Sequence, residues 1–281
     1  MNDIAINKKA KTENRQGQSA REKAIAARKA RAKKAAILRY GRIVVQILFF
    51  IFAPALFSQA FGGIKEIFTS MGSGTVIEVS VFVTKLIMLC LLTILCGRIF
   101  CGWACAFGAL GDWIFEIVQL ILKKLKIKPF KIPLKIVPYL QKVKYIILIL
   151  LLVLCFAQQN AMITQYSPWT PFSLWTAGNF KVAGLGGAIV LLLLIFIGMG
   201  IHERFFCQFL CPMGAVFSLL PEIPFLALKR KKEECIPNCQ ACRMQCPVKI
   251  KLDESPTADG ECIRCGRCTT VCPKKNIGFR E

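Results

Sequence analysis

Eight cysteines near the C-terminus have the spacing of iron–sulfur ligands. They form two runs, Cys235-x3-Cys239-x2-Cys242-x3-Cys246 and Cys262-x2-Cys265-x2-Cys268-x3-Cys272, and each run is followed directly by proline. The second run matches the bacterial spacing that holds a cubane cluster. We therefore expect residues 230–281 to form a ferredoxin-like α+β domain with two [4Fe-4S] clusters.

The ligand sets follow from the two-cluster pattern, in which the fourth cysteine of each run binds the cluster of the other run. One cluster would take Cys235, Cys239, Cys242 and Cys272, and the other would take Cys246, Cys262, Cys265 and Cys268. The first run has one extra residue in its first gap, which makes Cys235 the weakest assignment. Zinc is the alternative metal, although four-cysteine zinc sites usually pair two Cys-x2-Cys units across a longer gap.

Four further cysteines belong to an internal repeat with an offset of 106 residues. The shared pattern is Arg-x-Phe-Cys-x3-Cys-x2-Gly-Ala, which begins at Arg98 and again at Arg204. The cysteines of the repeat are Cys101, Cys105, Cys207 and Cys211. Residues four apart share one face of a helix, so each pair can direct both sulfurs the same way.

Brought together, the four thiolates of the repeat suit a third iron–sulfur cluster or a tetrahedral zinc ion. The two arginines of the repeat could offset the negative charge of such a group. Two alternatives remain open: a redox-active thiol pair, or small cysteines buried at a helix end.

The remainder of the chain has the composition of a membrane protein. Its 281 residues have a mean hydropathy of +0.52, yet their formal net charge is +22. Four stretches approach the roughly 20 apolar residues that cross a bilayer, and they cover residues 43–61, 79–96, 145–163 and 182–201. We expect an all-α polytopic domain over residues 43–229, with four transmembrane helices in two related pairs.

Each pair is expected to be followed by an interfacial helix at the inner membrane surface. The candidates are residues 107–122 and 213–228, which are apolar but interrupted by acids or prolines. Aromatic residues in the loop 164–180, Trp169 and Phe172 among them, predict a belt at the outer interface.

The charge of the loops predicts the orientation, because Lys and Arg accumulate on the cytoplasmic side. Residues 1–42 hold thirteen Lys or Arg against three acids, and residues 123–144 hold eight lysines. We therefore place both termini and the ferredoxin run on the cytoplasmic side of the inner membrane. Residues 1–42 would be a basic cytoplasmic arm on anionic lipid headgroups, and nucleic acid is not an expected partner.

The doubled Cys-x3-Cys, the four spans and the terminal cysteine runs together resemble the NapH/NosR-like family of membrane-bound, ferredoxin-type 4Fe-4S proteins, over about residues 40–275. The family pattern is Cys-x3-Cys-Pro twice, and Pro212 fits it whereas Ala106 replaces the first proline. The resemblance implies a membrane component of a quinol dehydrogenase, with the quinone pool and a redox protein as partners. The basic arm has no counterpart that we can assign to the family.

Four polar residues are candidates for contact with a quinone or another cofactor. Lys85 lies inside a predicted span, where an ionisable residue is functional by default, although its side chain could also snorkel to the interface. Residues 158–160, Gln-Gln-Asn, offer alternative contacts at a helix end. Haem is not expected, because a bis-histidine site needs two histidines and the chain has only His202, which we place at a solvated helix end.

Two functions of different classes follow from these motifs. The first is electron transfer between the quinone pool and a partner redox protein, through two ferredoxin clusters and a four-cysteine cluster. The second is a redox maturation or assembly factor, in which the Cys-x3-Cys pairs act as thiols or as a metal-reducing site. A transporter has less support, because four spans without an evident polar pathway leave little room for a substrate. The sequence specifies no oligomeric state.

Overall fold

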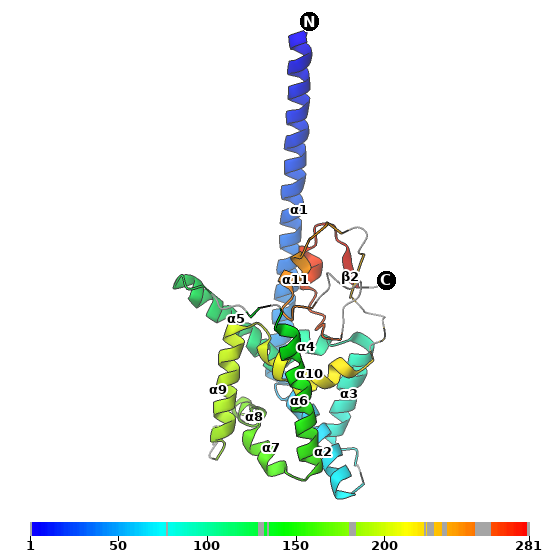
Figure 1. The fold of residues 1–281 in the computed structure, drawn as a ribbon, viewed down its shortest axis with the longest axis vertical. Helices are drawn as coiled ribbons and strands as arrows, with labels where there is room; N and C mark the ends of the chain where they lie inside the picture. The colour runs from blue at the N-terminus through cyan, green and yellow to red at the C-terminus, as the bar shows by residue number, and fades with distance from the viewer. Residues whose placement is uncertain are drawn as a thin grey trace.

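The computed structural model describes residues 2–76, 78–128, 132–133, 135–179, 184–221, 223, 228–231, 235–250 and 260–279, without the side chains of 2–20, 24 and 279. Figure 1 shows a long N-terminal helix, a bundle of helices beside its lower part, and a small C-terminal segment packed against its middle. The described ranges are mainly helical, with one small sheet in the C-terminal segment.

Helix α1 (Asn2–Phe52) runs without a break from the basic arm into the first apolar stretch. It ends just before Pro54, because the proline ring and the missing N–H do not fit inside a helix. The chain restarts as α2 (Leu56–Ser73). The predicted single span over 43–61 is therefore wrong, since it is divided between α1 and α2. The basic half of α1 projects beyond the bundle (Figure 1). Its expected position on anionic lipid headgroups stays a prediction.

Among the described residues, two helices are long and apolar enough to cross a bilayer: the part of α1 from Arg21, and α6 (Val137–Phe156). The apolar helices α3 (Val81–Cys96) and α9 (Gly186–Ile201) are shorter. Helix α6 begins eight residues before the predicted third span of 145–163, with a proline in its first turn. The layout of four transmembrane helices stays a prediction.

The sequence repeat is also a repeat of structure. Helices α3, α4 (Ile99–Trp103) and α5 (Ala106–Lys124) correspond in order to α9, η1 (Phe206–Leu210) and α10 (Pro212–Leu219). Helix α1 packs on α5 as α6 packs on α10, and α2 packs on α3 as α8 (Trp169–Thr176) packs on α9. The duplication therefore includes the helices that precede the cysteine motifs. Helix α10 is shorter than the predicted helix over 213–228, because Pro221 follows it.

The predicted outer aromatic belt is wrong for two of its members. Trp169 and Phe172 are buried inside the bundle, at 6% and 4% exposure. Helices α7 (Asn160–Tyr166) and α8 fold back against α9, which carries these rings inward. The Trp169 ring lies 4.7 Å from that of Phe61 and 5.9 Å from that of Phe57, measured between centroids.

The C-terminal segment is a small unit that brings its two cysteine runs together. Strand β1 (Leu228–Arg230) pairs antiparallel with β2 (Ile277–Phe279). Two short helices that pack on each other, α11 (Ala241–Gln245) and α12 (Arg267–Val271), each contain one cysteine and end at another. In Figure 1 this unit and both cysteine turns of the repeat lie at one end of the bundle, while the α6–α7 connection lies at the other.

Candidate functional site

One cavity in the bundle is lined by all four cysteines of the repeat. Three of these cysteines are buried and Cys105 is half-buried. Residues related by the repeat line the same cavity: Phe100 and Phe206 both do so, as do Phe107 and Met213. The structure therefore brings the two Cys-x3-Cys turns together around one space.

The local fold of each turn differs from the predicted single helix face. Cys101 lies in α4 and Cys207 in η1, but the second cysteine of each pair lies at the N-cap of the following helix. The Cys211 sulfur accepts a hydrogen bond from the backbone N–H of Gly214 at 3.3 Å. A helix N-terminus carries partial positive charge, which favours a thiolate at that position.

The two arginines of the repeat cross from one copy to the other. Arg204 donates hydrogen bonds to the carbonyl oxygens of Cys101 and Gly102, the latter at 3.2 Å. A Cβ atom at Gly108 would lie 2.3 Å from Arg204 Nη1, and one at Gly214 would lie 3.0 Å from Arg98 Nη2. The repeated pattern requires glycine because the arginine of the other copy occupies that space.

Arg204 is paired with a carboxylate that the sequence did not single out. Asp112, at 3% exposure, accepts hydrogen bonds from Arg204 at 2.6 and 2.8 Å and from Gln46 at 2.9 Å. Arg42 lies 3.4 Å from the same carboxylate. Burial would raise the pKa of Asp112, but Arg204 and Arg42 outweigh this effect and lower that pKa. Asp112 is therefore held as a carboxylate.

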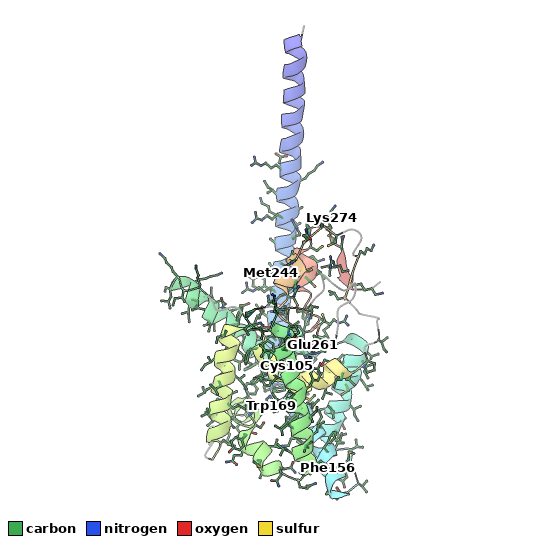
Figure 2. The ribbon with its side chains drawn as sticks, in the orientation of Figure 1. Cys105, Phe156, Trp169, Met244, Glu261 and Lys274 are labelled. Carbon is green, nitrogen blue, oxygen red and sulfur yellow. The ribbon has the colours of Figure 1, made fainter. Side chains whose placement is uncertain are left out.

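Arg98 is paired with a carboxylate from the C-terminal segment. Its Nη1 donates to Glu261 at 3.0 Å, and Lys144 of α6 binds the same carboxylate at 2.5 Å. Tyr145 also donates to Glu261, at 3.0 Å. Arg98 and Lys144 are almost completely buried. Figure 2 shows Glu261 near the level of Cys105, where the bundle meets the C-terminal segment.

These two groups of ion pairs carry an excess of positive charge beside the cavity. The cations are Arg42, Arg98, Lys144 and Arg204, and the carboxylates are Asp112 and Glu261. The network therefore has a formal charge of +2. Buried charge is costly unless it is compensated, and a [4Fe-4S] core in its oxidised state with four thiolates supplies about two negative charges. The donor set and its surroundings thus fit an anionic four-thiolate group.

Three of the four thiols of the cavity resist the loss of a proton. Burial raises the pKa of Cys105, Cys207 and Cys211, and neighbouring sulfurs add to the effect. Metal binding to cysteine releases protons for this reason. Among the described residues, no three His, Cys, Asp or Glu side chains are spaced as ligands of a single ion. A cubane instead places its thiolates around four irons.

The C-terminal cysteines are partly grouped as predicted. Burial, together with the neighbouring sulfur of Cys265, raises the pKa of Cys246 to about 11. Burial raises the pKa of Cys262 to about 12, with Cys246 and Cys265 contributing. Burial raises the pKa of the Cys268 thiol, and the sulfurs of Cys265, Cys262, Cys246 and Cys242 add to the effect. These thiols therefore lie near one another, and the division of the eight cysteines into two ligand sets stays a prediction. In each predicted set two cysteines are buried and two are half-buried.

Other predicted positions lie away from the cysteine cavity. Lys85 donates to Gln59 at 2.6 Å, about 16 Å along α3 from its C-terminal end. Gln158 donates to the Thr69 carbonyl at 2.7 Å, so this side chain ties α6 to α2. His202 was expected to be solvated, but it is buried at 8% exposure because its ring packs 5.3 Å from that of Phe209.

A second, larger cavity was not predicted from the sequence. It has a volume of about 460 Å³ and lies among α6, α7, α8, α9 and η1, with an almost wholly apolar lining. Trp169 lines it, and the buried indole Nε1 of this residue has no hydrogen-bond partner. Phe206 lines both this cavity and the cysteine cavity. Figure 2 shows Trp169 deeper in the bundle than Cys105.

Comparison with known sequences assigns the repeat to iron–sulfur chemistry. A family model described as a 4Fe-4S binding domain matches twice, at residues 81–128 and 185–232, and each match contains one Cys-x3-Cys turn. Uncharacterized protein MJ0750 of Methanocaldococcus jannaschii is 33% identical, over 85% of this chain and 94% of its own length. Ferredoxin-type protein NapH of Escherichia coli is 26% identical, over 72% of this chain and 69% of its own length.

The chain belongs to the NapH/NosR-like family of ferredoxin-type 4Fe-4S proteins. Regulatory protein NosR of Pseudomonas aeruginosa, another relative in that family, is 28% identical over 62% of this chain and 24% of its own length. No solved structure matches the chain with significance. The resemblance predicted from the motifs is confirmed, and the family match falls on the duplicated helices that form the cysteine cavity.

Proposed function

We propose that the protein is a membrane-bound iron–sulfur electron carrier that connects a quinone with a partner redox protein. The observation that carries the proposal is the cavity lined by Cys101, Cys105, Cys207 and Cys211 beside a charge network of +2. The description of the matching family model and the ferredoxin-type relatives support iron–sulfur binding. The protein would be the electron-transfer subunit of a quinol dehydrogenase in the cytoplasmic membrane.

The four cysteines of the cavity would hold one cluster, and the C-terminal runs would hold two more. Such clusters supply reversible one-electron transfer. The chain contributes the dry surroundings, the crossed arginines and the carboxylates that pair with those arginines. Because the cysteine turns and the C-terminal segment lie at one end of the bundle (Figure 1), the arrangement supports a relay that leads to the cytoplasmic side.

The apolar cavity of about 460 Å³ is the place we propose for the quinone. Ligand pockets of this size are typically apolar with a few polar groups that fix orientation. The Trp169 indole is a buried donor without a partner, and a quinone oxygen would satisfy it. Phe206 lines both this cavity and the cysteine cavity, so its aromatic ring would lie between quinone and cluster. Lys85 does not line this cavity and has no role in the proposal.

The maturation-factor alternative fits the charge of the site less well. A disulfide at Cys101 and Cys105, or at Cys207 and Cys211, is neutral and would leave the +2 network without compensation. Four thiolates around zinc would supply the same charge as an oxidised cubane, so the choice of metal must be measured. The charge of the network nevertheless favours a metal–thiolate centre over cycling thiols.

The quinone site can be tested with the purified protein in detergent. A short-chain quinol should bleach the cluster absorbance under anaerobic conditions. Trp169→Phe keeps a ring but removes the indole donor, so it should weaken the apparent affinity for the quinol by roughly 2- to 10-fold. Trp175→Phe in the same helix is the matched control, because Trp175 does not line the cavity. Equal effects of the two substitutions would contradict the proposed site.

A further inference from the structure

Both cysteine turns of the bundle touch the C-terminal segment at positions that correspond in the repeat. Gln208 of η1 donates to the Val248 carbonyl at 2.7 Å. The corresponding residue of α4 is Gly102, where a Cβ atom would lie 2.1 Å from the Ile263 carbonyl oxygen. Next to it, Trp103 Nε1 donates to the Arg264 carbonyl at 3.1 Å. The C-terminal segment is therefore docked on both turns.

These contacts select one of the two predicted ligand sets. Val248 lies two residues after Cys246, and Ile263 directly follows Cys262. Both cysteines belong to the predicted set Cys246, Cys262, Cys265 and Cys268. The docked face of the segment is thus the face that carries the set Cys246, Cys262, Cys265 and Cys268.

Glu261 joins the docked segment to the cysteine cavity. It directly precedes Cys262, and its carboxylate binds Arg98 at 3.0 Å, while Arg98 itself lines the cavity. Arg98 also donates to the carbonyl oxygen of Gly260 at 3.2 Å. Lys144 of α6 holds the other side of the carboxylate. A single guanidinium therefore touches both the cysteine cavity and the residue before a predicted cluster ligand.

We propose that Glu261 is a positioning residue that holds the set Cys246, Cys262, Cys265 and Cys268 against the cysteine cavity, so that electrons pass directly between these two centres. The set Cys235, Cys239, Cys242 and Cys272 is then the outer centre. This inference rests on the proposed function. Each step moves one electron, which one centre loses and the next gains, with no bond or proton transferred.

The charge of Glu261 should affect the midpoint potentials of the neighbouring centres, which a purely structural role would not do. Glu261→Gln removes a negative charge between two centres, so both become easier to reduce and their midpoint potentials rise. Lys144→Met removes a positive charge from the same contact, so the same two potentials fall. Charge effects weaken with distance, so the outer centre should shift less in both variants.

The experiment is a redox titration followed by EPR on the purified full-length protein. Glu116→Gln is the control, because Glu116 forms an exposed ion pair with Arg39 and should leave every potential unchanged. Opposite shifts of two centres in Glu261→Gln and Lys144→Met support the proposal. Equal shifts in the midpoint potentials of all three centres would overturn the proposal. Unchanged potentials in either variant, provided that it folds, would also overturn it.

The order of the centres can be measured separately by EPR. Two paramagnetic clusters that lie close together broaden each other's signals, so the broadening shows which centres are neighbours. The signal of the cavity cluster should lose its broadening in Cys262→Ser and keep it in Cys239→Ser. The reverse result would place the outer set beside the cavity and contradict the inference while leaving the proposed function intact. If the wild-type protein shows no third cluster, the proposed function itself fails.

Discussion

The pairing of Asp112 with Arg204 predicts a large difference between two acidic residues of one helix. Asp112 and Glu116 both lie in α5, but Asp112 binds buried Arg204 and Arg42, whereas Glu116 binds Arg39 at the surface. Asp112→Asn leaves two buried guanidinium groups without a counter-charge, and breaking a buried pair in this way costs about 3–5 kcal/mol. Glu116→Gln breaks an exposed pair, which costs about 0–1 kcal/mol.

The assay is thermal unfolding of the two variants and the wild type in the same detergent, followed by far-UV circular dichroism. For a chain of this size 1 kcal/mol corresponds to roughly 2–4 °C. Asp112→Asn should therefore lower the midpoint by roughly 6–20 °C, and Glu116→Gln by at most roughly 4 °C. Equal shifts would refute the reasoning, because Asp112 could then not be the counter-charge of the arginines beside the cavity.

Three further predictions follow from the same contacts. Gly108→Ala should displace Arg204 and lower the iron content of the purified protein. Gly186→Ala is the control and should leave the iron content unchanged, because a Cβ atom at Gly186 meets nothing within 4 Å. Equal iron contents of the two variants would contradict the crossed arrangement of the arginines. Because Asp112 has a lowered pKa in the folded chain, its contribution to stability is present above about pH 4 and fades below it. The difference in free energy of unfolding between wild type and Asp112→Asn should therefore decrease as the pH falls. An increase in this difference would contradict the prediction. Finally, a cysteine placed at Gly178 should react with a reagent that cannot cross the membrane and one placed at Lys126 should not; the opposite pattern would reverse the orientation.

The chemistry of the site was more predictable than its surroundings. The cysteine spacings and the 106-residue repeat indicate which thiols can act together, because metal ligation depends on residue type and spacing. The charges around the cavity were not predictable in the same way. Asp112 stood out only as an acid inside an apolar stretch, and Glu261 only as the residue before Cys262. Their partners, Arg204 and Arg98, are 92 and 163 residues away in the chain, so only the fold reveals the pairing.

The errors in the predicted fold have local physical causes. Hydropathy does not show that α1 ends before Pro54, so residues 43–61 were predicted to form one helix. Aromatic residues between two apolar stretches favour an interfacial belt, but α8 packs back on α9 and carries Trp169 into the core. This error concealed the apolar cavity, whose lining comes from five separate helices.

The central claim is that the two repeats share one iron–sulfur cluster, and iron quantification with EPR tests it most directly. Three [4Fe-4S] clusters require about twelve iron atoms per chain, against about eight for the C-terminal runs alone. The account predicts about twelve, with one and the same EPR signal lost in Cys101→Ser and in Cys207→Ser, because each repeat supplies ligands to that cluster. About eight iron atoms in the wild type, with every signal unchanged in both variants, would contradict it.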